Sequence, residues 1–322
     1  MRFVRIVAAL AIAAPGAAGA QGAVVVTDQV RAELVAYAPR GLLAGEPAWL
    51  GLAIAHQPHW HSYWKNPGDS GMATTLAWTL PRGVIAGPIE WPTPQRLPVG
   101  PLVNYGFEGK VLLPVALKLP ADFGSGALDV TMQAQWLVCK DVCIPQSGDF
   151  ALRVARAPSA QHAAAFARAR AALPQPVAGA SGRARVEGSD LSIDVSGLPR
   201  SWHGKSTQFF AEDGGVIEHA APVRQQWRGE VLSLRMALSS QRSESPQPMR
   251  AVLVAAGERA GAALSFTVDG GWPALGGVLP QVQAPDAPRA HDFWWPGLAA
   301  GAAALALGGY WALRRRRRGE RR

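Results

Sequence analysis

The stretch Leu128-Asp-Val-Thr-Met-Gln-Ala-Gln-Trp-Leu-Val138 alternates apolar and polar residues over most of its length. A period of two with one polar face predicts a half-buried antiparallel strand. Val111–Leu119 has an apolar residue at each odd position, and Phe150, Leu152 and Val154 continue the pattern after a turn. This part of the chain therefore reads as strands that cover a common core.

Short segments of this kind, separated by proline and glycine, extend over residues 24–155 and predict a first β-sandwich. Residues 183–270 are a second strand-rich region and predict a second β-sandwich. The connector 156–182 holds one expected helix, Ser159–Leu173, which is rich in alanine and lies between Pro158 and Pro174. The predicted fold class is all-β, with two β-sandwich domains joined by a short helix.

Both ends of the chain read as targeting segments. Residues 1–20 have two arginines, the apolar run Ile6–Ala14 and the small-residue site Ala18-Gly-Ala20, which is typical of a secretory signal peptide. A Pro/Gly-rich stalk is expected at 271–292. Phe293–Leu313 has no charge, is long enough at about 31 Å to cross a bilayer, and carries tryptophan and tyrosine at its edges.

The basic tail 314–322 follows this predicted single transmembrane helix at once. Its arginines favour a cytoplasmic C-terminus and a body in the bacterial periplasm, attached to the inner membrane. The formal net charge of the chain is +9, of which the tail supplies +6 and Arg2 and Arg5 supply +2. The remaining +1 gives the body no broad surface for a phosphate backbone, which argues against nucleic-acid binding.

Two cysteines, Cys139 and Cys143, are separated by Lys140-Asp-Val142. In an oxidising compartment a disulfide is their expected state, and the spacing fits the tip of a β-hairpin. A loop this short stabilises by only about 2 kcal/mol, so a structural bridge, a redox-active pair and a metal site all stay open. Alternation along the strand places Cys139 on the face of Gln133 and Gln135, so its thiol is expected to point outward.

The metal alternative rests on His56, His59 and His61. On a strand, His59 and His61 would share a face, and with two thiolates they would form a plausible set of zinc or copper ligands. Nothing in the sequence connects these histidines to the cysteines in space.

Four blocks of sequence together resemble a known family. They are His59–Gly71, Ile89–Pro92, Val103–Pro114 and Trp136–Pro145. In this order they are similar to the N-terminal periplasmic domain of the thiol:disulfide interchange protein DsbD, and most similar to its suppressor-of-copper-sensitivity branch. The resemblance covers about 24–176 well and 183–269 loosely.

The resemblance implies an immunoglobulin-like first domain and a cysteine pair that relays reducing equivalents from a membrane-embedded partner to periplasmic proteins. It also implies a cap segment over the disulfide, matched by Asn104–Gly109, with Phe107 as the expected lid, Tyr105 as second choice and Glu108 beside them. Full-length members continue into several membrane helices and a thioredoxin-like domain. This chain has one expected span and no further cysteine, so a separate multi-span protein would have to supply electrons.

The sequence thus predicts a membrane-anchored thiol–disulfide exchange module that uses no cofactor, with Cys139 and Cys143 as catalytic residues and disulfide-containing periplasmic proteins as partners. Two alternatives remain: a non-enzymatic binding or assembly module with a structural disulfide, and a copper-handling protein.

Overall fold

The structure is a computed structural model and describes residues 22–124 and 126–275. Two sheets are built from the first part of the chain. One has the strand order β1 (Val24–Val26), β2 (Val30–Tyr37), β3 (Ala48–His56), β9 (Lys110–Lys118) and β6 (Ile85–Ile89). The other has the order β11 (Cys143–Ala155), β10 (Ala127–Cys139), β4 (His61–Gly68), β8 (Leu102–Glu108) and β7 (Gln95–Val99), with β5 (Thr75–Thr79) also paired to β10.

These two sheets share one apolar core, as expected for a sandwich. The even positions of β10 that alternate with polar residues in the sequence are all buried, from Leu128 to Val138. They pack with Leu34 of β2 and Leu50 of β3 from the other sheet. The period-two pattern therefore predicted both the strand and the face that it buries.

The remaining eight strands form a single hydrogen-bonded path. Its order is β15 (Thr207–Ala211), β18 (Met249–Ala255), β19 (Ala262–Asp269), β13 (Ser181–Glu187), β14 (Asp190–Ser196), β17 (Val231–Ala237) and β16 (Arg224–Arg228), with β12 (Gln175–Pro176) added to β19. All but β12 and β16 contribute buried residues to one core cluster. Alternation predicted the strands of this region. The expected second sandwich has two sheets, whereas the structure joins these strands in one hydrogen-bonded sheet.

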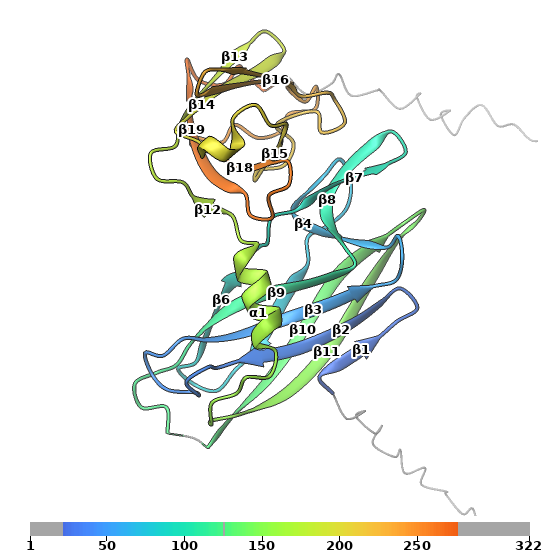
Figure 1. The fold of residues 1–322 in the computed structure, drawn as a ribbon. Coiled ribbons are helices and arrows are strands. Elements are labelled where there is room, and N and C mark those ends of the chain that lie inside the picture. The colour runs from blue at the N-terminus through green and yellow to red at the C-terminus, as the bar shows by residue number, and fades with distance from the viewer. Residues whose placement is uncertain (1–21, 125, 276–322) are drawn as a thin grey trace, which may run out of the picture. The chain divides into compact units, whose positions relative to one another are not determined.

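One α-helix, α1 (Ala163–Ala171), and one short 3-10 helix, Arg200–Trp202, occur among the described residues. The helix is shorter than the expected Ser159–Leu173 and begins after His162, which adopts a positive φ of 63°. Phe166 is fully buried and packs on Val35 of β2 and Leu112 of β9, so α1 covers the outer face of the first sheet (Figure 1). The connector is therefore also a packing element.

The expected signal peptide 1–20, transmembrane helix 293–313 and tail 314–322 lie outside the described residues. Within 22–124 and 126–275, no helix is long and apolar enough to cross a membrane. Only 271–275 of the expected stalk are described. There Trp272 donates its indole N–H to Pro246 O at 2.8 Å and lies under the guanidinium of Arg242.

Candidate functional site: the Cys139–Cys143 hairpin tip

The two cysteines are joined at the tip of the longest hairpin in the described part of the chain. β10 and β11 pair from Ala127↔Ala155 to Cys139↔Cys143, so the cysteines lie directly opposite each other. Their sulfurs form a disulfide of 2.05 Å with a Cα–Cα distance of 4.2 Å. Lys140 and Val142 close the turn through a backbone hydrogen bond of 3.3 Å. The prediction of a hairpin-tip disulfide is confirmed.

The two cysteines differ in exposure. Cys139 retains 3% of its accessible surface, whereas Cys143 is exposed. The expectation that Cys139 points outward is therefore wrong. Cys139 is paired within the sheet to Cys143 on β11 and to His61 on β4, and it is buried, whereas Gln133 and Gln135 farther along β10 are exposed. Alternation predicts on which face of a strand a residue lies, but it does not predict whether that residue is buried.

Tyr63 on β4 is the aromatic residue that reaches the disulfide. Its hydroxyl lies 3.5 Å from Cys143 Sγ and, since a disulfide sulfur carries no hydrogen, the hydroxyl is the donor. The ring is fully buried and packs against Gly71, where an added Cβ would lie 2.1 Å from the Tyr63 Cε1 atom. Gly71 also has a φ of +112°, so glycine is required here both for the backbone and for the ring.

The polar group behind Tyr63 is Asn104 of β8. Its amide donates to the Tyr63 hydroxyl at 3.5 Å, and its Oδ1 accepts from the backbone N–H and the hydroxyl of Ser70 at 3.2 and 3.0 Å. Burial raises the pKa of the Tyr63 phenol, an effect that a hydrogen bond with Ser70 opposes. Tyr63 is therefore protonated at neutral pH and keeps a proton to donate toward sulfur.

The cap segment expected from the resemblance is β8 with the turn that follows it. Phe107 is 6% exposed and packs with Trp64 and Leu113 in a buried cluster. Tyr105 is buried, and its hydroxyl lies 2.9 Å from His219 Nδ1, beside the ring of Phe210. The buried cluster that holds both rings does not include either cysteine, and the lid role of Phe107 stays a prediction.

Glu108 ends β8 and is exposed, opposite His61 in the strand register. Burial lowers the pKa of His61, and the charge of Glu108 partly opposes this. Burial also lowers the pKa of His56 to about 4, although its ring is hydrogen-bonded at 2.8 Å to Gly109 O, which favours the charged form. Neutral imidazoles are therefore expected beside the hairpin tip at pH 7.

The histidines do not form the expected ligand set. His59 lies in the turn before β4 with a φ of 68°, not on the strand, so it does not share a face with His61. The turn is closed by a hydrogen bond from Trp60 N to Gln57 O. Across 22–124 and 126–275, no group of three or more histidine, cysteine or acidic side chains is placed to hold a metal ion.

Comparison with known proteins places this geometry in a family. Residues 30–155 match the family model "Thiol:disulfide interchange protein DsbD, N-terminal". This segment is similar to a DsbD N-terminal domain. The disulfide, Tyr63 and the cap segment all lie inside the matched residues, and the eight-stranded region 175–269 lies outside them.

A solved structure is similar over more of the chain than this family model. It is the N-terminal periplasmic domain of ScsB from Proteus mirabilis, with a TM-score of 0.57 and 18% identity. The match covers 77% of this chain and 98% of the ScsB chain, so both β-rich regions have a counterpart in the fold. No curated protein matches the chain.

Tyr63 and His219 are the site residues that sequence reasoning missed. Tyr63 lies in the block His59–Gly71 that carries the resemblance, two residues after His61, so strand alternation could have placed both on the face of the cysteines. His219 is separated from Tyr105 by 114 residues, and no local pattern joins them.

Proposed function

We propose that this chain is a membrane-anchored periplasmic module that exchanges thiols and disulfides with partner proteins through Cys139 and Cys143. The observation that carries the proposal is the asymmetry of the pair: an exposed Cys143 bonded to a Cys139 that is 3% exposed, at a hairpin tip inside the segment that matches the DsbD N-terminal family model. A partner protein can therefore approach the sulfur of Cys143 but not that of Cys139. This assigns attack to Cys143 and resolution to Cys139.

The reaction balances as a two-electron transfer. In the reduced module, the Cys143 thiolate attacks one sulfur of a partner disulfide, and the other partner sulfur leaves as a thiolate that takes up a proton. The Cys139 thiolate then attacks Cys143 Sγ and releases the second partner thiol. The partner gains two electrons and two protons, and the module returns to the disulfide form.

Tyr63 supports the attacking sulfur. A buried, protonated phenol at 3.5 Å can donate to the Cys143 thiolate, which favours the charged form and lowers the pKa of the thiol. Asn104 and Ser70 fix the position of the phenol from the opposite side. Lys140 adds a positive charge next to Cys139 and Asp141 adds a negative one, so the turn gives no clear net field.

Export and anchoring belong to this proposal, with 1–20 as the signal peptide and 293–313 as the single span. The first domain is immunoglobulin-like on this proposal. Because the chain has two cysteines in all, re-reduction of Cys139–Cys143 requires an external donor, which we propose to be a multi-span membrane protein.

Trapping of mixed disulfides tests the proposal. Cys139→Ser leaves Cys143 exposed without its resolving partner, so mixed disulfides with periplasmic proteins should accumulate on non-reducing gels. Cys143→Ser is the matched control, because it leaves one buried thiol and should trap far less. Equal trapping by the two variants, or none by either, would overturn the assignment.

Reduction of the disulfide separates this function from a binding module with a structural bridge. Closure of so short a loop stabilises by about 2 kcal/mol, so the reduced protein should stay folded. We expect a reduction potential above about −300 mV, the value below which structural bridges typically lie. Unfolding on reduction, or a lower potential, would favour the binding module.

A further inference from the structure

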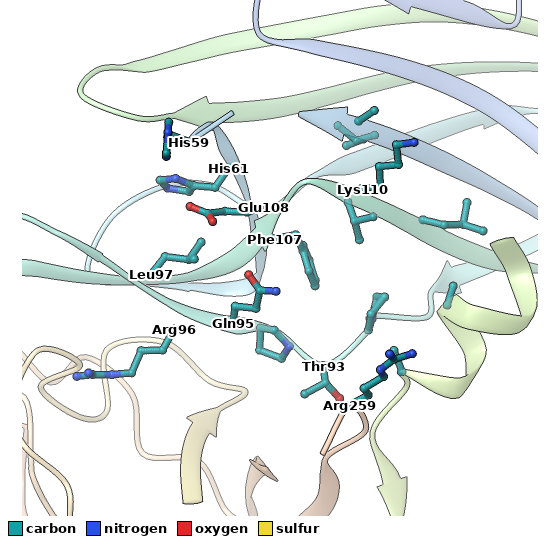
Figure 2. Close-up of a pocket in the computed structure, with 18 of the residues that line it drawn as sticks. His59, His61, Thr93, Gln95, Arg96, Leu97, Phe107, Glu108, Lys110 and Arg259 are labelled. Carbon is teal, nitrogen blue, oxygen red and sulfur yellow. The ribbon is translucent and has the colours of Figure 1, made fainter. Parts of the chain in front are cut away.

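A large groove adjoins the hairpin tip. Its volume is about 1500 Å³, and it is lined by β7, the end of β8, α1 and the turn residues Lys140 and Asp141. His59, His61 and Glu108 lie at one end, Arg259 lies at the other, and Phe107 points into the space between them (Figure 2). The volume exceeds the roughly 300–1000 Å³ typical of small-molecule sites, which suits a polypeptide segment better.

The groove follows the outer strand of a sheet. β7 pairs with β8 on one side, and no other strand among the described residues pairs with it. An open edge can accept an extended peptide. Pro94 and Pro98 have no backbone N–H, however, so this edge offers few donors to a partner's main chain. Side chains must therefore supply most of the recognition.

Unpaired cations dominate those side chains. Lys110, Lys140, Arg168 and Arg259 line the groove, are exposed and form no ion pair within the described residues. Among the carboxylates that line the groove, only Glu108 and Asp141 are likewise exposed and without an ion pair in the described residues. The other charged lining residues already have partners: Arg31 pairs with Glu33, Glu258 with Lys205, and Arg96 donates to His219 O.

We propose that this groove docks an extended, acidic segment of the protein whose disulfide Cys143 attacks. Complementary charge steers such a segment toward the groove and suppresses basic competitors. The segment would run from Arg259 past Phe107 to Lys140, the residue next to Cys139 in the chain. Docking there brings a disulfide at the end of the segment to the hairpin tip. The inference rests on the proposed function and names the class of partner.

Binding without redox chemistry tests the docking directly. Two fluorescent peptides of equal length, one rich in glutamate and one rich in lysine, each with serine in place of cysteine, are titrated with the oxidised protein by fluorescence anisotropy. We expect the acidic peptide to bind about tenfold more tightly at low salt, with the difference lost at ~1 M salt, where the Debye length is about 3 Å.

Charge reversal assigns the binding to the groove. The double variant Lys110→Glu, Arg168→Glu should remove the preference for the acidic peptide. Lys118→Glu is the matched control, because Lys118 lies exposed at the opposite end of β9 from Lys110 and outside the groove. Circular dichroism confirms that the variants are folded. No preference in the wild type, or the same loss with Lys118→Glu, would overturn the proposal.

A second pair of peptides, with the two cysteines restored as a disulfide, separates this inference from the proposed function. If the reduced protein reduces the acidic peptide faster than the basic one, and the double variant loses this difference, both stand. If the acidic peptide binds but no exchange occurs, docking stands and the exchange function fails. If both peptides are reduced at equal rates, the exchange function stands and acidic docking is overturned.

Discussion

The two β-rich regions of the described chain bury different kinds of side chain. In 175–269 one cluster of apolar residues fills most of the interior, while Phe210 and Val252 pack in a separate cluster with Trp64 and Phe107 of the first region. His219 is the one buried polar or charged side chain of this region. In 24–155 five such side chains are buried, namely His61, Ser62, Asn66, Thr74 and Asn104. All five lie on β4, on β8 or just before β5, and β4 and β8 are the strands that carry Tyr63 and the cap segment.

Burying a polar group costs free energy unless a hydrogen bond replaces water, so such groups are not a route to stability by themselves. One of them, Asn104, holds Tyr63 at the sulfur of Cys143, whereas Asn66 donates to Ala211 O of the second region. The interior of the second region is almost entirely apolar, with His219 as its one buried polar side chain. The comparison indicates that stability and chemistry are carried by different parts of the molecule, and each prediction below tests that division.

Truncation in the second core should give the largest effect on stability and none on chemistry. Phe266 on β19 is fully buried among apolar side chains. Phe266→Ala should lower the free energy of unfolding by about 3–5 kcal/mol, measured by urea denaturation. The rate at which dithiothreitol reduces Cys139–Cys143 should not change in the folded protein. An altered rate would show that the two regions are coupled.

Phe107 tests the division where the two regions meet, because its buried cluster also contains Phe210 and Val252 of the second region. Its packing with Trp64 and Leu113 predicts that Phe107→Ala costs about 3 kcal/mol and leaves the reduction rate by a small thiol unchanged. Leu113→Ala is the control, since it empties the same cluster without removing the ring. Faster reduction with a small loss of stability in Phe107→Ala alone would support the lid role that the family resemblance implies.

Much of the fold could be predicted from the sequence because period-two alternation is a local property. It identified β10 and the strands of the second region, and the short spacing of the two cysteines placed them at a hairpin tip. Alternation failed for Cys139, which is buried although Gln133 and Gln135 on its strand face are exposed, and for His59, which lies in a turn before its strand. It could not find the pairs Tyr63–Cys143 and Tyr105–His219, because these depend on tertiary contacts.

Acid should affect the first region through His56. Burial lowers the folded-state pKa of His56 to about 4 from an ordinary value of 6.5, so the unfolded chain takes up the proton first. The contribution of neutral His56 to the free energy of unfolding is therefore complete above pH 6.5 and is lost as the pH falls toward 4. The loss should be about 1–2 kcal/mol once partial solvation is allowed for.

Urea denaturation of the wild type and of His56→Gln between pH 4 and pH 7 measures this loss. Glutamine keeps a donor for Gly109 O but does not titrate, so the variant should show a flatter pH dependence. His59→Asn is the control, because His59 is exposed and asparagine tolerates its positive φ. Equal slopes in the wild type and His56→Gln would assign the acid sensitivity to other groups.

Tyr63→Phe should give the smallest change in stability and a specific change in chemistry. Removing one hydrogen bond costs about 1 kcal/mol. If the phenol donates to the Cys143 thiolate, its loss should raise the pKa of that thiol by about one unit. The thiolate fraction at neutral pH then falls about tenfold, while the intrinsic nucleophilicity rises about threefold, so exchange should slow about threefold. Tyr37→Phe is the matched control, because Tyr37 stacks on Trp49 and Phe166 in the cluster between α1 and the first sheet, which contains neither cysteine. Stopped-flow rates of the reduced proteins with a small disulfide, measured from pH 5 to pH 10, separate the two effects. A shifted profile in Tyr63→Phe alone places the phenol in the chemistry, whereas an unchanged profile would mean that Tyr63 only fills space beside Cys143.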